Sequence, residues 1–168
     1  MPDRPENLIG AHFRQRGWKL AVAESCTGGL ISHRITNAAG SSDYFLGGVT
    51  AYSYEAKEQL LGVDHATILR LGAVSQETVV EMATGVRSAL RADVAISASG
   101  IAGPGGGLPN KPVGTVWIGI CVPDGIWAKR FLFPGDRSEV KASTAEESLQ
   151  ALLRYFAEGH PWQNGQVL

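Results

Sequence analysis

The chain is short of cysteine, of net charge and of long hydrophobic runs, and each shortage excludes a class of protein. Only two cysteines occur among 168 residues, too few for a disulfide framework. The formal net charge is −1, so no overall positive field favours nucleic acid. No apolar run reaches the roughly 18 residues of a membrane span, and the polar start has no signal-peptide core. We therefore expect a cytoplasmic protein that binds neither nucleic acid nor membrane.

Histidine is also scarce, and its spacing does not suggest metal binding. The cysteines and the four histidines form no C-x-x-C or H-x-x-x-H pattern, so we expect no metal. No histidine lies at the end of a predicted strand or beside a glycine-rich loop. A Ser-His-Asp triad is therefore not indicated, although the sequence alone leaves it open.

Buried strand-like runs alternate with segments of helical periodicity along the chain. Strands are predicted at 18–23, 44–54 and 93–100, and a hairpin around Pro-Asp-Gly at 123–125. Helices are predicted at 6–16, 26–40, 55–62, 64–71, 75–92 and, beginning near Asp136, up to 159. This order favours one α/β domain over 1–168, a three-layer α/β/α sandwich with a mixed, mostly parallel sheet. Its core covers about 6–157, and the tail 158–168 is predicted to be loose.

The segment Ala-Glu-Ser-Cys-Thr-Gly-Gly at 23–29 joins a predicted strand to a predicted helix and places two possible nucleophiles, Ser25 and Cys26, side by side. The strand end would point Ser25 out of the sheet, beside helical N–H groups that favour an anion. Gly28 and Gly29 would let a ligand approach that backbone closely. Alternatively, Ser25 or Thr27 simply caps the helix, and spacing alone leaves these two interpretations even.

A serine nucleophile needs a base, and Lys57 is the remaining plausible one. It follows the second predicted strand by a few residues, and Tyr52 lies at the end of that strand. If the first two strands are neighbours, Ser25, Tyr52 and Lys57 converge on one sheet edge. Composition alone favours an ordinary surface lysine, because a neutral lysine requires desolvation or a nearby cation.

Two further segments could hold an anion. Residues 99–107 contain five glycines among nine residues directly after a predicted strand, so their N–H groups suit a phosphate or carboxylate. The pattern is neither a Walker A loop nor G-x-G-x-x-G, and a mobile connection is equally plausible. Arg137 falls in the first turn of the last helix, where the dipole disfavours a cation. This position hints at a bound anion, although surface arginines are more frequent.

Five segments together resemble one known family, the CinA C-terminal domain family, over about residues 6–157. In chain order they are AESCTGGL, VTAYSYEAKEQLLGV, GAVSQETVVEMA, SASGIAGPGGG with KPVGTVWIGI, and FPGDR. The resemblance implies a three-layer α/β/α fold, a homodimer or larger assembly and no cofactor. It also implies hydrolysis of nicotinamide mononucleotide to nicotinate mononucleotide and ammonia, as in pyridine nucleotide recycling.

The resemblance assigns roles residue by residue. The motif serine, taken as the nucleophile, corresponds to Ser25; the motif lysine and tyrosine correspond to Lys57 and Tyr52. The chain departs from the family pattern Y-S-N-E-A-K at Tyr54, where the family has asparagine. The residues expected to bind substrate are Thr27, Gly28, Gly29, Ser99, Gly100, Gly103, Gly105 and Arg137. The N–H groups near 27–29 would stabilise the oxyanion, and the 99–107 loop with Arg137 would hold the ribose phosphate. The alternatives are a noncatalytic nucleotide-binding module that regulates a partner, and an amidohydrolase for another nucleotide-like amide.

Overall fold

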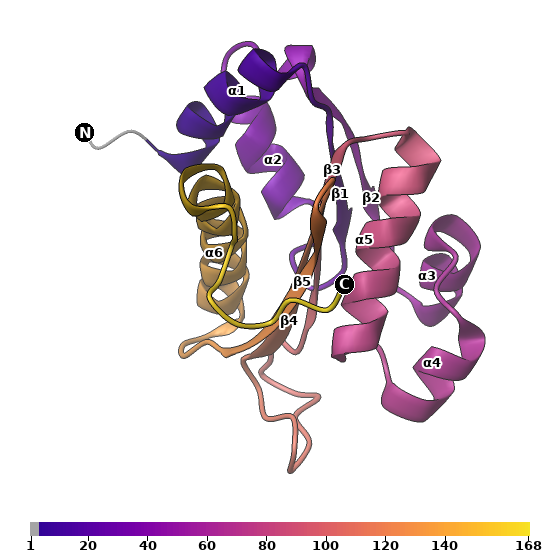
Figure 1. The fold of residues 1–168 in the computed structure, drawn as a ribbon. Coiled ribbons are helices and arrows are strands. Elements are labelled where there is room, and N and C mark those ends of the chain that lie inside the picture. The colour runs from indigo at the N-terminus through magenta and orange to yellow at the C-terminus, as the bar shows by residue number, and fades with distance from the viewer. Residues whose placement is uncertain (1–3) are drawn as a thin grey trace.

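A five-stranded sheet forms the middle layer of the computed structural model, which describes residues 4–168 (Figure 1). The strands are β1 (Leu20–Glu24), β2 (Phe45–Thr50), β3 (Val94–Gly100), β4 (Thr115–Val122) and β5 (Gly125–Leu132). Their order is β2-β1-β3-β4-β5, with β1 parallel to β2 and β3, and the pairs β3–β4 and β4–β5 antiparallel. All strands except β4 therefore run in one direction, which confirms the mixed, mostly parallel sheet.

Helices cover both faces of the sheet and complete the predicted three layers. One face carries α1 (Pro5–Arg16), α2 (Leu30–Asn37) and α6 (Arg137–Glu158). The other carries α3 (Tyr54–Leu61), α4 (His65–Leu71) and α5 (Gln76–Leu90). A 3-10 turn, Ser41–Asp43, leads into β2.

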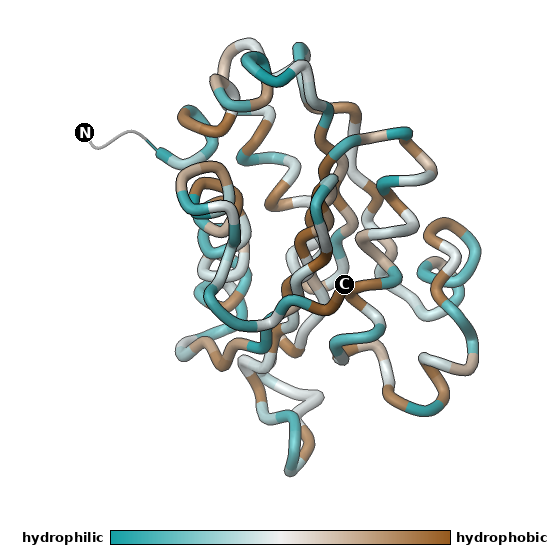
Figure 2. Tube along the Cα trace, in the orientation of Figure 1, coloured by the Kyte–Doolittle hydropathy of each residue, from teal (hydrophilic) through white to brown (hydrophobic). Residues whose placement is uncertain are grey.

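The central strand β1 shows why the sheet needs cover on both faces. All five of its residues are buried, and the apolar ones alternate between two cores. Leu20 and Val22 pack with α1, α2 and α6, whereas Ala21 and Ala23 pack beneath α5. Figure 2 shows this concentration of apolar residues along the middle layer.

Several predicted boundaries move in the structure. The helix expected over 26–40 is confined to Leu30–Asn37, because 25–29 form a turn whose Gly29 has φ 100°. The strands expected at 18–23 and 44–54 are Leu20–Glu24 and Phe45–Thr50. The helix starts at Ser75 and Asp136 are confirmed, since both side chains cap the N–H groups that follow them.

The tail differs from its expectation, because residues 158–168 pack against β5 instead of hanging loose. Trp162 is buried, and its indole N–H donates to Glu147 on α6 at 2.8 Å. The N–H groups of Ile126 and Ala128 donate to carbonyls of Leu168 and Gly165, each at 2.9 Å. The tail thus satisfies the outer edge of β5, whose backbone would otherwise lack partners.

Candidate active site

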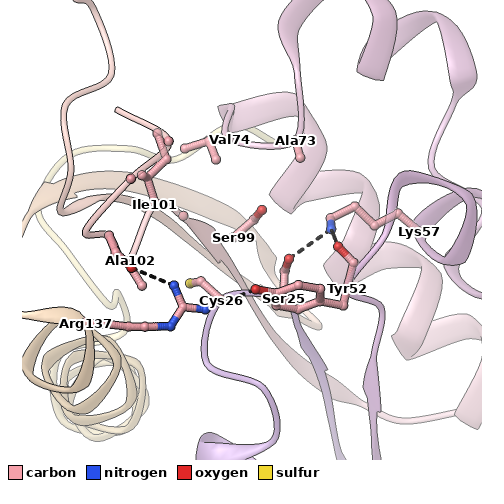
Figure 3. Close-up of a pocket in the computed structure, with 14 residues that line it drawn as sticks. Ser25, Cys26, Tyr52, Lys57, Ala73, Val74, Ser99, Ile101, Ala102 and Arg137 are labelled. Carbon is pink, nitrogen blue, oxygen red and sulfur yellow. Dashed lines mark hydrogen bonds between the residues drawn. The ribbon is translucent and has the colours of Figure 1, made fainter. Parts of the chain in front are cut away.

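A pocket of about 260 Å³ opens at the carboxyl ends of β1 and β3 (Figure 3). Of the predicted site residues, the structure brings together Ser25, Tyr52, Lys57, Ser99, Gly100, Gly103, Gly105 and Arg137. Of the remaining lining residues, Cys26 is the other possible nucleophile of the 23–29 segment, and Ile101, Ala102 and Gly106 belong to the predicted 99–107 loop. Only Ala73 and Val74 were given no role from the sequence. Ala73 and Val74 come from the connection between α4 and α5. They lie within the family segment GAVSQETVVEMA, but their small apolar side chains carry no sign of a role in a site.

Strand pairing places Ser25 at the floor of this pocket. Glu24 pairs with Ala98 in the parallel β1–β3 register, and the Ser25 N–H donates to the Ala98 carbonyl at 3.0 Å. Ser25, directly after β1, and Ser99, near the end of β3, therefore lie at the same level of the sheet. Both are nearly buried, with exposed fractions of 8% and 1%.

Lys57 reaches Ser25 from the first turns of α3. Ser53 caps this helix through its hydroxyl, which fixes the face on which Lys57 lies. The Lys57 side chain is 1% exposed, and its Nζ lies 2.9 Å from Ser25 Oγ. Nζ also donates to the carbonyls of Ala51 at 2.9 Å and Tyr52 at 3.0 Å. The lysine that composition alone would place on the surface is inside the pocket.

The surroundings of Lys57 favour a neutral amine. Burial lowers its pKa from 10.5 to about 8, and no salt bridge to an acid compensates among residues 4–168. A neutral amine has two N–H donors and one lone pair. The carbonyls of Ala51 and Tyr52 accept the two donors, which leaves the lone pair for the Ser25 hydroxyl. The same contacts would suit an ammonium group donating three times, so proton transfer between Ser25 and Lys57 needs little rearrangement.

Cys26 lines the pocket, but its chemistry differs from that of Ser25. The side chain is buried, and burial raises the pKa of the thiol to about 12. A thiol with this pKa stays protonated near neutral pH and is a weak nucleophile. No hydrogen-bonded base contacts the Cys26 sulfur among residues 4–168. Of the two adjacent candidates, only Ser25 has a base.

Thr27, Gly28 and Gly29 do not line the pocket, and the N–H groups of both glycines are paired within the protein, which corrects the role predicted for the two glycines. Glu24, buried at the end of β1, turns its carboxylate into the start of α2. It accepts the Gly29 N–H at 3.0 Å and the Thr27 hydroxyl at 2.6 Å, while the Gly28 N–H donates to the Ser25 carbonyl. Further donors to the same carboxylate are the N–H groups of Ile31 and Ser32 and the Ser32 hydroxyl. The N–H groups of Gly28, Gly29, Ile31 and Ser32 are therefore paired within the protein, whereas the Thr27 N–H has no acceptor in another residue of 4–168.

Backbone donors remain in the glycine-rich loop after β3. The loop is anchored by the Ile101 N–H, which donates to Thr115, and by Ile101's carbonyl, which accepts from Gly114. Within the part of the chain that the structure describes, no acceptor binds the N–H groups of Ala102, Gly103, Gly105 and Gly106. The Cys26 N–H likewise has no acceptor in another residue of 4–168. Unpaired backbone N–H groups that line a pocket suit an anionic or carbonyl oxygen.

Arg137 lies on the side of the pocket opposite Lys57, and Tyr52 spans the space between them (Figure 3). Arg137 donates to the Gly103 carbonyl at 2.7 Å and to the Tyr52 hydroxyl at 3.1 Å. Tyr52 thus touches Lys57 through its carbonyl and Arg137 through its ring hydroxyl. Tyr54, the departure from the family pattern, begins α3 with its side chain half-exposed, and it is not among the lining residues.

The described residues show neither a cluster of metal ligands nor a membrane-spanning helix. Across 4–168, no group of three or more His, Cys, Asp or Glu side chains is arranged to hold a metal ion. Nor does any helix in that range combine the length and apolar character needed to cross a bilayer.

Comparison with known proteins identifies the family. The model of the CinA C-terminal domain matches residues 3–156. The chain belongs to the CinA C-terminal domain family. A CinA-superfamily protein from Klebsiella pneumoniae 700603 has the same fold, with a TM-score of 0.88 and 36% identity over 91% of this chain and 96% of that one.

Relatives of this family differ in length. The "Nicotinamide-nucleotide amidohydrolase PncC" of Enterobacter agglomerans is 52% identical over 149 residues, covering 88% of this chain and 91% of that protein. A "CinA-like protein" of Desulfotalea psychrophila is 46% identical over 156 residues, covering 93% of this chain. This chain spans only 38% of the Desulfotalea protein's length. It therefore corresponds to one part of the longer relatives and to nearly all of the shorter one.

Proposed function

We propose that this protein hydrolyses the carboxamide of nicotinamide mononucleotide to nicotinate mononucleotide and ammonia. The observation that carries the proposal is the 2.9 Å contact between the buried Lys57 amine and the Ser25 hydroxyl inside the pocket. Its substrate follows from the Enterobacter agglomerans relative, which is similar over almost the whole of both chains and is named for this activity.

The first half of the reaction forms an acyl-enzyme. Neutral Lys57 takes the proton of Ser25 as Oγ attacks the carboxamide carbon, giving a tetrahedral intermediate with a negative oxygen. The unpaired N–H groups of Cys26 and the 102–106 loop are the donors available to that oxygen. One such donor contributes about 3–4 kcal/mol in hydrolases. Protonated Lys57 then gives its proton to the nitrogen as the C–N bond breaks and ammonia leaves.

The second half regenerates the enzyme. Water attacks the acyl carbon, and Lys57 accepts one of its protons. The Ser25–acyl bond breaks, Lys57 returns the proton to Oγ, and the carboxylic acid product gives its remaining proton to solvent and leaves as the carboxylate. Tyr52 holds Lys57 through its carbonyl, so we assign it a positioning role.

The experiment is ammonia release from nicotinamide mononucleotide by the purified wild type, with three variants beside it. Ser25→Ala is expected to remove nearly all turnover, and Lys57→Arg to do the same because arginine cannot act as a neutral base. Cys26→Ala is the matched control and should retain most activity. Release by Ser25→Ala at the wild-type rate would sink the mechanism. Binding of the nucleotide without release by the wild type would favour a regulatory binding module instead.

We further propose that this activity serves pyridine nucleotide recycling in the cytoplasm and that the protein acts as a homodimer or larger assembly. Light scattering on the eluting protein measures the assembly directly. A monomer at micromolar concentration would contradict that part of the proposal.

A further inference from the structure

A second cavity adjoins the candidate active site on the far side of Arg137. Its volume is about 530 Å³, and it shares Ala102 and Arg137 with the first pocket. The lining combines apolar groups with the start of α6: Ala102, Pro104, Val113, Gly135, Asp136, Arg137, Ser138 and Lys141. A ligand that leaves the first pocket past Arg137 therefore enters this cavity.

Two cationic side chains of α6, Arg137 and Lys141, lie where the two cavities meet. Arg137 and Lys141 are four positions apart, so they lie on the same side of the helix one turn from each other. Lys141 also lies close to the turn after Ser25, because a Cβ placed on Gly28 would be 3.7 Å from its Nζ. The ammonium group thus stands between the second cavity and the backbone that carries the proposed nucleophile.

Lys141 has no protein counter-charge. Among residues 4–168, no carboxylate lies within salt-bridge distance of it, although α6 is rich in acids. These acids are engaged elsewhere: Glu139 accepts the Asp136 N–H, Glu146 pairs with Arg34, and Glu147 pairs with Arg154. The one carboxylate in the lining, Asp136, accepts from Ser138 and Glu139 through a single oxygen to cap the helix.

We propose that this second cavity is the subsite for a phosphomonoester and that Lys141 is the residue that selects a nucleotide over its nucleoside. The inference rests on the proposed function, since it names how the same site recognises the remote end of that substrate. A phosphate held beside Arg137 would supply the anion that Lys141 lacks. The apolar surfaces of Ala102, Pro104 and Val113 would then pack against the sugar carbons.

The test compares nicotinamide mononucleotide with nicotinamide riboside, which is the same molecule without the phosphate. Lys141→Met keeps most of the aliphatic stem and removes the charge. It should raise KM for the nucleotide about ten- to a hundredfold, the size expected of a charged hydrogen bond. kcat for the nucleotide and kcat/KM for the riboside should stay near wild type, and Lys141→Arg should restore most of the nucleotide KM. Lys129→Met, on the exposed side of β5, controls for loss of one positive charge.

Two results overturn the proposal. Equal losses with nucleotide and riboside would mean that Lys141 acts on the reacting centre, and an unchanged KM would mean that it does not contact the phosphate. Calorimetric titration of both compounds into the Ser25→Ala variant gives a readout that needs no turnover. If the wild type fails to release ammonia, the proposed function fails. The subsite then stands only if the nucleotide binds more tightly than the riboside and Lys141→Met in the Ser25→Ala background removes the difference.

Discussion

The Lys57 amine and the Ser25 hydroxyl lie 2.9 Å apart, although 32 positions separate them in the chain. They meet because β1 and β2 are parallel neighbours, so the segments after both strands emerge at one edge of the sheet. Ser25 follows β1 directly. Lys57 lies at the end of the first turn of α3, the helix that follows β2. The pair is thus a product of the sheet order and not of sequence proximity.

Activity should rise with pH through the titration of Lys57. Its pKa is lowered to about 8 by burial, and only the neutral amine can accept the Ser25 proton. Below this pKa most molecules carry the inactive ammonium form. We expect kcat/KM to increase about tenfold from about pH 7 to about pH 9 and then level off. A pH–rate profile for ammonia release checks this, and a flat profile over that interval would argue against Lys57 as the base.

The free energy of unfolding should also depend on the titration of Lys57, and it should increase as the pH rises. The pKa of Lys57 in the folded protein, about 8, lies below its ordinary value of 10.5, so the folded state disfavours the proton. Below about pH 8 this lowers the free energy of unfolding by roughly 3 kcal/mol, and the penalty disappears as the pH rises toward 10.5. Wild type should therefore gain stability over Lys57→Met between about pH 7 and about pH 10. Urea denaturation of both proteins at each pH measures the difference, which a purely steric effect would leave constant.

The Cys26 thiol should react slowly with alkylating reagents, although it lines the pocket. Its thiol is buried and its pKa is raised to about 12, so the reactive thiolate is rare near neutral pH. We expect iodoacetamide to modify Cys26 in the native protein at least about tenfold more slowly than a free thiol. Mass spectrometry of the modified peptide gives the rate, with the unfolded protein in urea as the reference. Rapid native modification that also stops ammonia release would return Cys26 to the list of nucleophiles.

Glu24 should matter for both stability and turnover. Its carboxylate accepts from the Thr27 and Ser32 hydroxyls and from three N–H groups at the start of α2. Glu24→Gln replaces one accepting oxygen with a donor, so buried N–H groups lose their partner. We expect a loss of about 2–4 kcal/mol in the free energy of unfolding. kcat should fall as well, because the turn that positions Ser25 loosens. Glu77→Gln, an exposed acid in the first turn of α5, is the control and should change neither quantity.

The tail should stabilise the fold without taking part in the reaction. Trp162 packs against Phe131 and donates to Glu147, and it lies outside the lining of the candidate site. Trp162→Ala should lower the free energy of unfolding by about 3–5 kcal/mol, the range for a buried tryptophan. Where the variant remains folded, its KM should equal that of wild type. An unchanged denaturation midpoint would mean that the tail is not held in solution as the structure shows.

The predictable parts of this molecule are those that local patterns encode. Periodicity and β-branched runs located every main helix and strand, and the caps at Ser75 and Asp136 marked two helix starts. Ser25 was found because a strand, a turn and a helix follow one another there. Lys57 was a candidate because it follows the second predicted strand, but only the family resemblance made it the favoured base, since a single lysine in a short helix carries no sign of burial. Its environment depends on which strands are neighbours, and periodicity does not encode that.

Two predictions differ from the structure for the same reason: the ligand-binding N–H groups of Gly28 and Gly29, and the loose tail at 158–168. In both cases hydrogen bonds join residues that are not close in the sequence. Glu24 reaches forward to Ser32, so it occupies N–H groups that a local interpretation assigns to a ligand. The carbonyls of the tail residues Gly165 and Leu168 accept hydrogen bonds from β5, more than 30 positions away in the sequence. A periodic sequence pattern does not predict such a contact. A glutamate at the end of an entirely apolar strand was the available signal in the first case, because a buried charge must find partners.

The site is divided along the chain in a way that bears on how such a protein can diverge. The proposed chemical pair, Ser25 and Lys57, belongs to the first two strand–helix units. The surfaces that would recognise the rest of a ligand, the 99–107 loop and the α6 positions Arg137 and Lys141, come from the later part of the chain. Substitutions in that later part can alter which amide is accepted while the nucleophile and its base stay as they are. Selection for a new substrate and preservation of the chemistry therefore act on different stretches of the gene.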